Sequence, residues 1–228
     1  MNKAIYFLAV VSILMTGCIG DDIIFDTVEE EVRISNAIDS LKLGDTYQFE
    51  AKFLNNVGQE EERFVLWSSS DPTVLSINED GLATGLTLGE AIVTATVDLD
   101  GTNSVTDEIP VVVNEDNTVI SVTERTGSLR TTSSYVLQGS FLLKTEGDQL
   151  ILELENDYVA SSSLPGLYVY MTNNPNSVSG ALELGKVPVF DGAHSYEIPA
   201  GVELNTYNYL LYYCKPFAVK VGDGEFEN

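Results

Sequence analysis

Two cysteines carry the most reactive chemistry that this sequence offers. Cys18 follows a run of apolar residues near the start of the chain, and Cys214 lies close to its end. A thiolate is a strong nucleophile and a good metal ligand, so the reactions to consider are acylation, redox exchange and ligation of a cofactor. The segment around each cysteine indicates which of these reactions applies.

The segment before Cys18 has the pattern of a signal peptide. Lys3 gives a short positive start, and residues 4–15 are almost entirely apolar. A helix that rises about 1.5 Å per residue is too short over this run to cross a bilayer core of about 30 Å. The following Met-Thr-Gly-Cys resembles a lipobox, so we expect cleavage after residue 17 and lipid attachment to Cys18. Several acyl chains would anchor the chain firmly to a membrane.

An acidic tether, residues 18–29, follows the expected lipid anchor. It begins with Ile19, Gly20, Asp21 and Asp22. In some Gram-negative lineages, acidic residues just after the lipid cysteine resemble a signal for transfer to the outer face of the outer membrane. We therefore predict an outer-membrane lipoprotein at the cell surface, with a periplasm-facing lipoprotein as the alternative.

Cys214 is the only thiol left once Cys18 is acylated, which rules out an internal disulfide. A straight strand through it would turn its side chain away from the core. Pro216 indicates a bulge or an edge, and one extra residue there would produce a shared buried face. That face would contain Leu210, Tyr212, Cys214, Phe217, Val219 and Val221. We favour burial because free cysteine is among the most buried residue types.

His194, Met171 and Cys214 are the residues whose chemistry suits an axial ligand of haem. His194 lies in Gly-Ala-His-Ser, which predicts an exposed loop, whereas Met171 continues the inward face of Leu167 and Val169. The sequence has no Cys-x-x-Cys-His attachment motif. With one histidine and no cysteine pair, we expect no metal site, zinc included.

Aromatic residues suggest a further kind of site, because Tyr168, Tyr170 and Tyr196 could stack against a protein or glycan ligand. Tyrosine is also an ordinary residue on the wet face of a sheet. A single histidine could pair with a serine, but no Gly-x-Ser-x-Gly elbow is present. We therefore do not expect an enzyme.

The charge of the chain excludes one class of partner. There are 35 acidic and 11 basic residues, which gives a formal net charge of -24. Such a chain repels phosphate backbones, so we expect no nucleic-acid partner. Residues 29–31 and 60–62 are runs of glutamate. Consecutive residues of a strand point to opposite faces and cannot converge on one Ca²⁺, so these runs are predicted to be solvated loops.

The elements that would position these residues are short strands. Alternation of apolar and polar residues is clearest in residues 46–53 and 91–99, and turn residues recur every few positions. This pattern predicts an all-β chain with two consecutive β-sandwich domains, residues 30–115 and 116–228. The polar junction at residues 114–117 is short, which limits how far the domains can separate.

The first domain carries three motifs in order, at residues 67–72, 78–85 and 89–96. Together they resemble the group-two bacterial Ig-like domain, which occurs in surface proteins of the invasin and intimin type. The resemblance covers residues 30–115. It implies an immunoglobulin-like sandwich that acts as a spacer, a stalk or an adhesive module, with Trp67 in its core.

The second domain also carries motifs in order, the main ones being Leu-Tyr-Val-Tyr at residues 167–170, Tyr-Glu-Ile-Pro at 196–199 and Cys-Lys-Pro-Phe at 214–217. They resemble the electron-transfer DM-thirteen domain. That resemblance implies redox chemistry through a single cysteine, either as a free thiol or as a ligand of a prosthetic group such as haem. The corresponding position here is Cys214.

These patterns lead to one functional hypothesis and one alternative. We expect a membrane-anchored extracytoplasmic lipoprotein in which the Ig-like stalk displays the C-terminal β-sandwich for binding or adhesion, with a protein or a glycan as the ligand. The alternative is an electron-transfer protein that uses Cys214 as a redox thiol or as a haem ligand.

Overall fold

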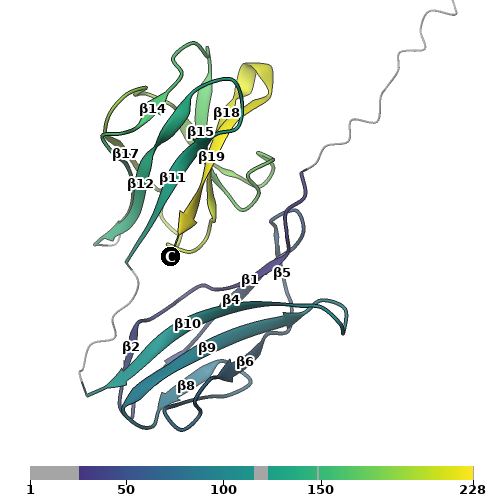
Figure 1. Ribbon diagram of the computed structural model, residues 1–228, viewed down its shortest axis with the longest axis vertical. Coiled ribbons are helices and arrows are strands. Elements are labelled where there is room, and N and C mark those ends of the chain that lie inside the picture. Colours follow the sequence, from purple (N-terminus) through teal and green to yellow (C-terminus); the bar gives the residue numbers. More distant parts are fainter. Residues whose placement is uncertain (1–25, 116–122, 148, 228) are drawn as a thin grey trace, which may run out of the picture.

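The computed structural model describes residues 26–115, 123–147 and 149–227. Strands form almost all of the regular structure there, and the one helical element is a short 3-10 turn, η1 (Lys215–Phe217). The strands build two β units, one on each side of residues 116–122 (Figure 1). The all-β prediction is confirmed. None of the helical structure in the described ranges is long and apolar enough to cross a membrane.

The first unit contains three small sheets. Their strand orders are β1-β4-β5, β2-β10-β9-β6 and β3-β8-β7, and every pairing is antiparallel except that of β2 with β10. The strands are β1 (Glu31–Ile34), β2 (Ser40–Lys42), β3 (Thr46–Gln48), β4 (Ala51–Leu54), β5 (Glu60–Glu61), β6 (Leu66–Ser69), β7 (Leu75–Ile77), β8 (Leu82–Gly85), β9 (Gly89–Asp98) and β10 (Ser104–Asn114).

Alternation of side chains fills the core of this unit. Ala91, Val93, Ala95 and Val97 are buried along β9, as the sequence predicts. Residues 46–53 also alternate, yet they do not form one strand. The chain passes from β3, which pairs with β8, to β4, which pairs with β1, and so moves from one sheet to another. Between them the amide of Phe49 donates to the carbonyl oxygen of Gly81.

Trp67 packs against this core but is only half-buried, so the expectation of a core tryptophan holds in part. Its ring lies 6.1 Å from that of Phe49, centroid to centroid. The backbone of Gly81 passes close to the indole, because a Cβ on Gly81 would lie 2.9 Å from Nε1 of Trp67. Gly81 also has a φ of +82°, which glycine adopts easily.

The glutamate runs are not solvated loops throughout, which corrects the prediction. Glu31 lies in β1, and Glu60 and Glu61 form β5. The reason is cross-strand pairing: β4 runs between β1 and β5 and supplies hydrogen-bond partners on both of its edges. Glu31 and Glu60 then point toward basic side chains rather than toward bulk water alone.

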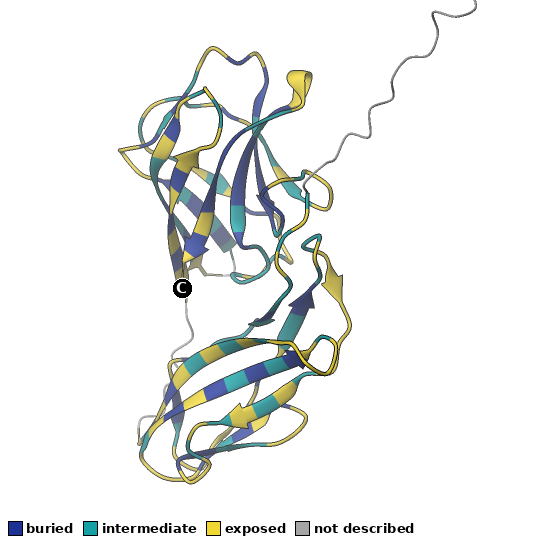
Figure 2. Ribbon diagram, turned by 45° about the vertical axis from the view of Figure 1, so that its right-hand side comes forward, coloured by how far each residue is buried: buried dark blue, intermediate teal, exposed yellow. Residues whose placement is uncertain are grey.

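The second unit is one strongly curved antiparallel sheet with the order β16-β15-β18-β19-β11-β12-β13-β17, and β14 pairs with β12. Its strands are β11 (Glu124–Thr131), β12 (Leu137–Glu146), β13 (Gln149–Leu154), β14 (Val159–Ala160), β15 (Leu167–Thr172), β16 (Leu182–Lys186), β17 (His194–Glu197), β18 (Tyr209–Cys214) and β19 (Val219–Glu227). The curved sheet encloses one apolar core, and exposed and buried residues alternate along its strands (Figure 2).

Candidate functional site

Cys18 and the predicted signal peptide, residues 1–17, lie outside the described residues. The same holds for most of the predicted acidic tether, residues 18–25. Lipid attachment to Cys18 therefore stays a prediction from the sequence.

Cys214 ends β18 and is fully buried in the core of the second unit. Burial is the expected outcome, but the local structure differs from the expected bulge. The chain reverses through η1 after Cys214, so β18 and β19 form a hairpin rather than one strand. Phe217 sits in this turn and is 63% exposed, which makes its prediction as a core residue wrong. The irregularity in pairing falls instead between Tyr212 and Tyr213.

A buried thiol should not react with reagents in solution. We expect Cys214 in the folded protein to stay unmodified by a thiol reagent at neutral pH, and to react fully once urea unfolds the chain, because reaction requires an accessible thiolate. Titration with a chromogenic disulfide reagent, with and without urea, measures this. Full reaction in the native protein within the mixing time would contradict the burial of Cys214.

His194 is not in an exposed loop, which corrects the prediction. It opens β17 as a half-buried residue, held by the pairing of Leu154 with His194 in the β13–β17 ladder. Its Nδ1 lies 3.1 Å from the carbonyl oxygen of Gly192. Since a carbonyl can only accept, Nδ1 carries the proton when the ring is neutral, and Nε2 keeps its lone pair.

An aromatic cluster surrounds His194 inside the second unit. Its ring centroid lies 4.7 Å from that of Tyr158 and 5.4 Å from that of Tyr196, and Tyr158 lies 6.2 Å from Tyr212. The phenol oxygen of Tyr196 and Nε2 of His194 are buried without a hydrogen-bond partner among the described residues, and the buried phenols of Tyr158 and Tyr212 have only each other within reach. Burial raises the pKa of Tyr158 to about 12 and raises the pKa of Tyr196 and of Tyr212 as well. These phenols are therefore neutral at physiological pH.

The predicted haem ligands do not fit a haem in this arrangement. Met171 and Cys214 are both fully buried and belong to the same tightly packed apolar core, as expected for Met171. A porphyrin could reach either sulfur only by displacing the strands that cover it. His194 faces tyrosine rings rather than either sulfur. No group of three or more histidine, cysteine or acidic residues in the described ranges could hold a metal ion.

The three tyrosines proposed for ligand stacking do not form one platform. Tyr168 and Tyr170 lie on β15, next to one edge strand of the sheet, whereas Tyr196 lies on β17 at the other end of the strand order. Tyr170 is buried. Nζ of Lys215 lies 4.2 Å from the ring centroid of Tyr168 and also pairs with Glu183 at 2.5 Å, which raises the pKa of Lys215. The lysine therefore occupies the face that a ligand would need.

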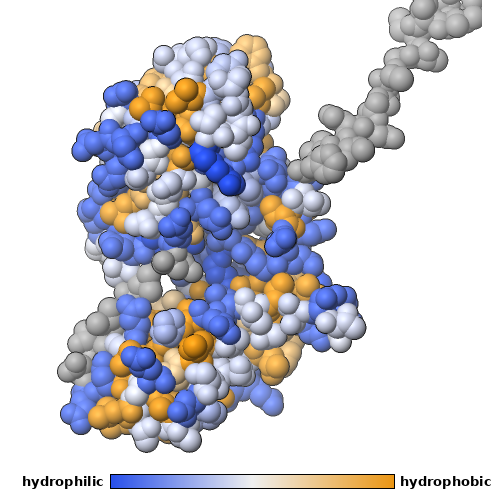
Figure 3. Space-filling view, viewed as in Figure 1, coloured by the Kyte–Doolittle hydropathy of each residue, from blue (hydrophilic) through white to orange (hydrophobic). Residues whose placement is uncertain are grey.

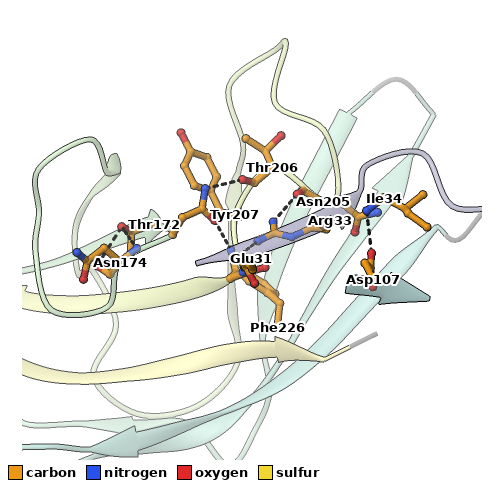
Figure 4. Close-up of polar contacts among 12 residues, drawn as sticks. Glu31, Arg33, Ile34, Asp107, Thr172, Asn174, Asn205, Thr206, Tyr207 and Phe226 are labelled. Carbon is orange, nitrogen blue, oxygen red and sulfur yellow. Dashed lines mark hydrogen bonds and ion pairs between the residues drawn. The ribbon is translucent and has the colours of Figure 1, made fainter. Parts of the chain in front are cut away.

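The structure brings together a different set of residues, at the junction of the two units. The loop after β15 and the loop between β17 and β18 meet β1 (Figure 4). The turn between β4 and β5 lies against the loop after β15. Nη1 of Arg33 donates to the carbonyl oxygen of Asn205 at 2.6 Å, and Nδ2 of Asn205 donates to the carbonyl oxygen of Ser35 at 3.2 Å. Nδ2 of Asn208 donates to the carboxylate of Glu31.

A second set of hydrogen bonds joins the units through Asn174, which is buried. Its Nδ2 donates to the carbonyl oxygens of Asp26 and, at 3.3 Å, of Val57, while its Oδ1 accepts from the amide of Asn176. Gly58 approaches the same loop so closely that a Cβ on it would lie 2.6 Å from the carbonyl oxygen of Asn173. We refer to these contacts, from Arg33 through Gly58 to Asn174, Asn205 and Asn208, as the joint.

Arg125 of β11 lies behind the joint and is buried. It donates to the carbonyl oxygens of Tyr207 at 2.9 Å and Phe226 at 2.8 Å, and its guanidinium lies over the ring of Phe226. Burial, with the nearby charge of Arg33, lowers the pKa of Arg125 to about 10, so it remains charged. It fixes the loop that carries Tyr207 and Asn205 into the joint.

A cavity of about 220 Å³ lies between the units at the joint. Most of the residues that line it are polar, among them Arg33, Lys52, Gln59, Asn173, Thr206 and Tyr207. Hydrophilic surface continues from one unit to the other beside it (Figure 3). Burial raises the pKa of Tyr207, and the nearby charge of Lys52, which belongs to the other unit, opposes this rise.

Reasoning from the sequence missed the joint and the cavity entirely. Arg33, Asn174 and Asn205 are ordinary polar residues of a strand and of loops, and their partners are more than a hundred residues away. A signal existed only in the Asn-Asn-Val-Gly turn at residues 55–58 and in Asn173-Asn174. Both read as turns, and neither indicates a partner.

Comparison with known proteins defines the class of the first unit. Residues 30–109 match the family model described as "Bacterial Ig-like domain (group 2)", so this part of the chain is a bacterial Ig-like domain and the resemblance drawn from its motifs is confirmed. The match indicates an extracellular domain of the surface or adhesion type. The DM-thirteen resemblance of the second unit stays a prediction.

One related sequence and two solved structures also match parts of the chain. An uncharacterized protein of Clostridium acetobutylicum is 33% identical over 84 residues, which are 36% of this chain and 20% of that protein; the chain thus matches about a fifth of its relative's length. Two structures of the S-layer protein SbsC cover 89% of this chain and 40% of theirs, at 11% identity and TM-scores of 0.28 and 0.29.

Proposed function

We propose that this protein is a lipid-anchored surface protein in which the Ig-like domain holds the C-terminal β unit at a fixed orientation for binding. The observation that carries the proposal is the joint. A flexible pair of domains needs only a linker, whereas here side chains of each unit donate to backbone oxygens of the other. Such contacts restrict relative motion, which otherwise is the default between domains.

The anchor in this proposal is Cys18. The sequence supplies the signal peptide pattern and the lipobox, and the first described residues run directly into the joint, since Asp26 accepts a hydrogen bond from Asn174. A membrane anchor therefore lies only a few residues from the junction of the two units. In the proposal both units stand on the outer face of the outer membrane, with the periplasmic face as the alternative.

Replacing Cys18 by Ala tests the anchor. The unaltered protein is expected in the membrane fraction with an acylated N-terminal Cys18, because several acyl chains hold a protein on a bilayer. Cys18→Ala should leave the protein soluble or unprocessed. Fractionation and mass spectrometry of the N-terminal peptide measure this, and Cys214→Ala serves as the matched control. A mature N-terminus at any residue other than Cys18 would contradict the proposal. Protease treatment of whole cells shows whether the protein lies on the outer face or on the periplasmic face of the outer membrane.

Electron transfer remains a second candidate function because of the cluster of Tyr158, Tyr196, Tyr212 and His194. Buried polar atoms without partners are unusual and often mark a functional or hydrated site. The cluster shares its core with Cys214. In this candidate function the buried thiol would lose one electron through the rings to an external one-electron oxidant, together with its proton, and would regain both on reduction, without direct contact with either reagent. A reversible one-electron wave in protein-film voltammetry that disappears in Cys214→Ala supports it, and the absence of any wave counts against it.

A further inference from the structure

The cavity between the two units has an unusual lining. Ligand pockets are mostly apolar with a few polar groups. Here most of the lining residues are polar or charged, while apolar surface, to which Leu54, Val57 and Tyr207 can contribute, is at least as extensive. A guest that matches this lining must offer both hydrogen-bonding groups and an apolar face.

Two cations stand side by side at the cavity. Arg33 of β1 and Lys52 of β4 are directly paired in the antiparallel register, so their side chains share one face of the sheet. Like charges directly opposite each other are unfavourable in such a pair. Each has a carboxylate partner, Glu31 for Arg33 at 2.6 Å and Glu60 for Lys52 at 3.1 Å. The result is a pair of neighbouring cations with a carboxylate on each side.

Hydrogen bonds hold one wall of the cavity in place, and other side chains of the lining can contact a guest. The side-chain amide of Asn173 donates to the carbonyl oxygen of Thr206 and accepts from the backbone amide of Asn208. These two hydrogen bonds fix the loop that forms one wall of the cavity. Gln59, which is exposed, and Tyr207, which is half-buried, also line the cavity. Their side chains can therefore contact a guest.

We propose that this cavity binds a saccharide unit, with both domains contributing to the site. The inference rests on the proposed display function and names its ligand class. The ring of Tyr207 stacks against the apolar face of the sugar, and Lys52 and Gln59 bond to its hydroxyl groups. Arg33, held by Glu31 and by the carbonyl oxygen of Asn205, forms the rigid floor of the site.

A volume of about 220 Å³ suits one sugar ring rather than a folded peptide. The lining also argues against an apolar side chain of a partner protein, because such a group would remove water from Gln59, and from the donors of Lys52 that Glu60 does not engage, without replacing its hydrogen bonds. Because the cavity has both cationic and anionic side chains, its charge does not decide between a neutral sugar and a uronic acid. The experiment below distinguishes these two kinds of sugar.

The test uses the full mature chain with Cys18→Ser to keep it soluble. A glycan array of broad composition is followed by calorimetry with two probes, the neutral N,N′-diacetylchitobiose and the acidic digalacturonate. We expect binding of one probe or of an array sugar, with a Kd of about 1 mM or tighter. Tyr207→Ala and Lys52→Gln should each weaken binding about tenfold, whereas Tyr207→Phe, which keeps the ring, should not.

Lys186→Gln is the matched control, since Lys186 is exposed on β16 and does not line the cavity. Two results overturn the inference: no sugar of the array binds, or sugar binds equally well to Tyr207→Ala, Lys52→Gln and the unaltered protein. Circular dichroism confirms that each variant folds. Failure here leaves the anchor experiment untouched, so a protein that is lipid-anchored but binds no sugar refutes this inference alone.

Discussion

Gly58→Ala should detach the C-terminal unit from the Ig-like domain while both stay folded. A methyl group at residue 58 would lie 2.6 Å from the carbonyl oxygen of Asn173, a backbone atom that cannot move without moving the loop. Gly58 also has a φ of +74°, which disfavours alanine. Overpacking of this kind costs about 1–3 kcal/mol, which is comparable to the free energy that a few hydrogen bonds across the joint contribute.

Pulsed electron paramagnetic resonance measures the detachment. Spin labels at the exposed Glu90 and Thr132, one in each unit, should give a narrow distance distribution in the parent protein and a broad one in Gly58→Ala. Gly101→Ala is the matched control, because Gly101 has a φ of +81° and open space around it. A narrow distribution in Gly58→Ala, or equal broadening in both variants, would show that the contact with Asn173 does not hold the units together.

The same substitution bears on the saccharide inference, because the cavity has walls from both units. If Gly58→Ala opens the joint, Lys52 and Tyr207 separate and sugar binding should fall, although neither residue is changed. Gly101→Ala should leave binding intact. If Gly58→Ala separates the two units but still binds the sugar with unchanged affinity, the sugar site lies on one unit alone.

Local patterns predicted the elements of this fold well. The alternation of Ala91, Val93, Ala95 and Val97 depends only on the period of a strand, and it required no knowledge of the partner strands. The turn motifs located the Ig-like domain for the same reason. Predictions failed where the choice of partner strand decides the outcome, as for Glu31 of β1 and for Glu60 and Glu61 of β5, which pair on the two edges of β4.

The hairpin at Cys214 shows the limit most clearly. An apolar run interrupted by Lys215 and Pro216 fits a bulged strand and a tight reversal equally well. The structure selects the reversal: Ala218 takes a left-handed conformation with a φ of 50°, and Pro216 packs onto Gly166 of a distant loop. That contact fixes the turn and leaves Phe217 exposed. No feature of residues 210–221 alone specifies it.

The joint could not be predicted because its groups are individually unremarkable. Arg33 could equally be a solvated strand residue, and Asn174 could equally cap a turn. What brings them together is that two loops of one unit converge on one sheet edge of the other. A domain pair whose junction is built from side-chain contacts to backbone oxygens depends on its exact docking, so substitutions there should alter orientation before stability.

Gly127→Ala should destabilise the C-terminal unit more than any other single methyl group added to it. A Cβ at residue 127 would lie 2.2 Å from the carbonyl oxygen of Glu225 and 2.2 Å from Cζ of Phe141. Glu225 belongs to β19, which pairs with β11 at this point, so relief requires breaking the ladder. Phe141 is buried and meets Phe226 edge to face at 5.1 Å, so its ring cannot easily move away.

The expected loss is about 3 kcal/mol, at the upper end of overpacking costs, which lowers the melting temperature of this unit by about 15 °C. Differential scanning calorimetry should show the transition of the Ig-like domain unmoved and that of the C-terminal unit shifted. Gly147→Ala is the control, since Gly147 has open space around it and a φ of +62°, so its cost is the backbone strain alone, about 1 kcal/mol. Adding Phe141→Leu to Gly127→Ala should restore part of the loss, because the smaller side chain relieves one of the two clashes. Equal melting temperatures for the Gly127→Ala and Gly147→Ala proteins would mean that β11 does not pack against β19 and Phe141 as described.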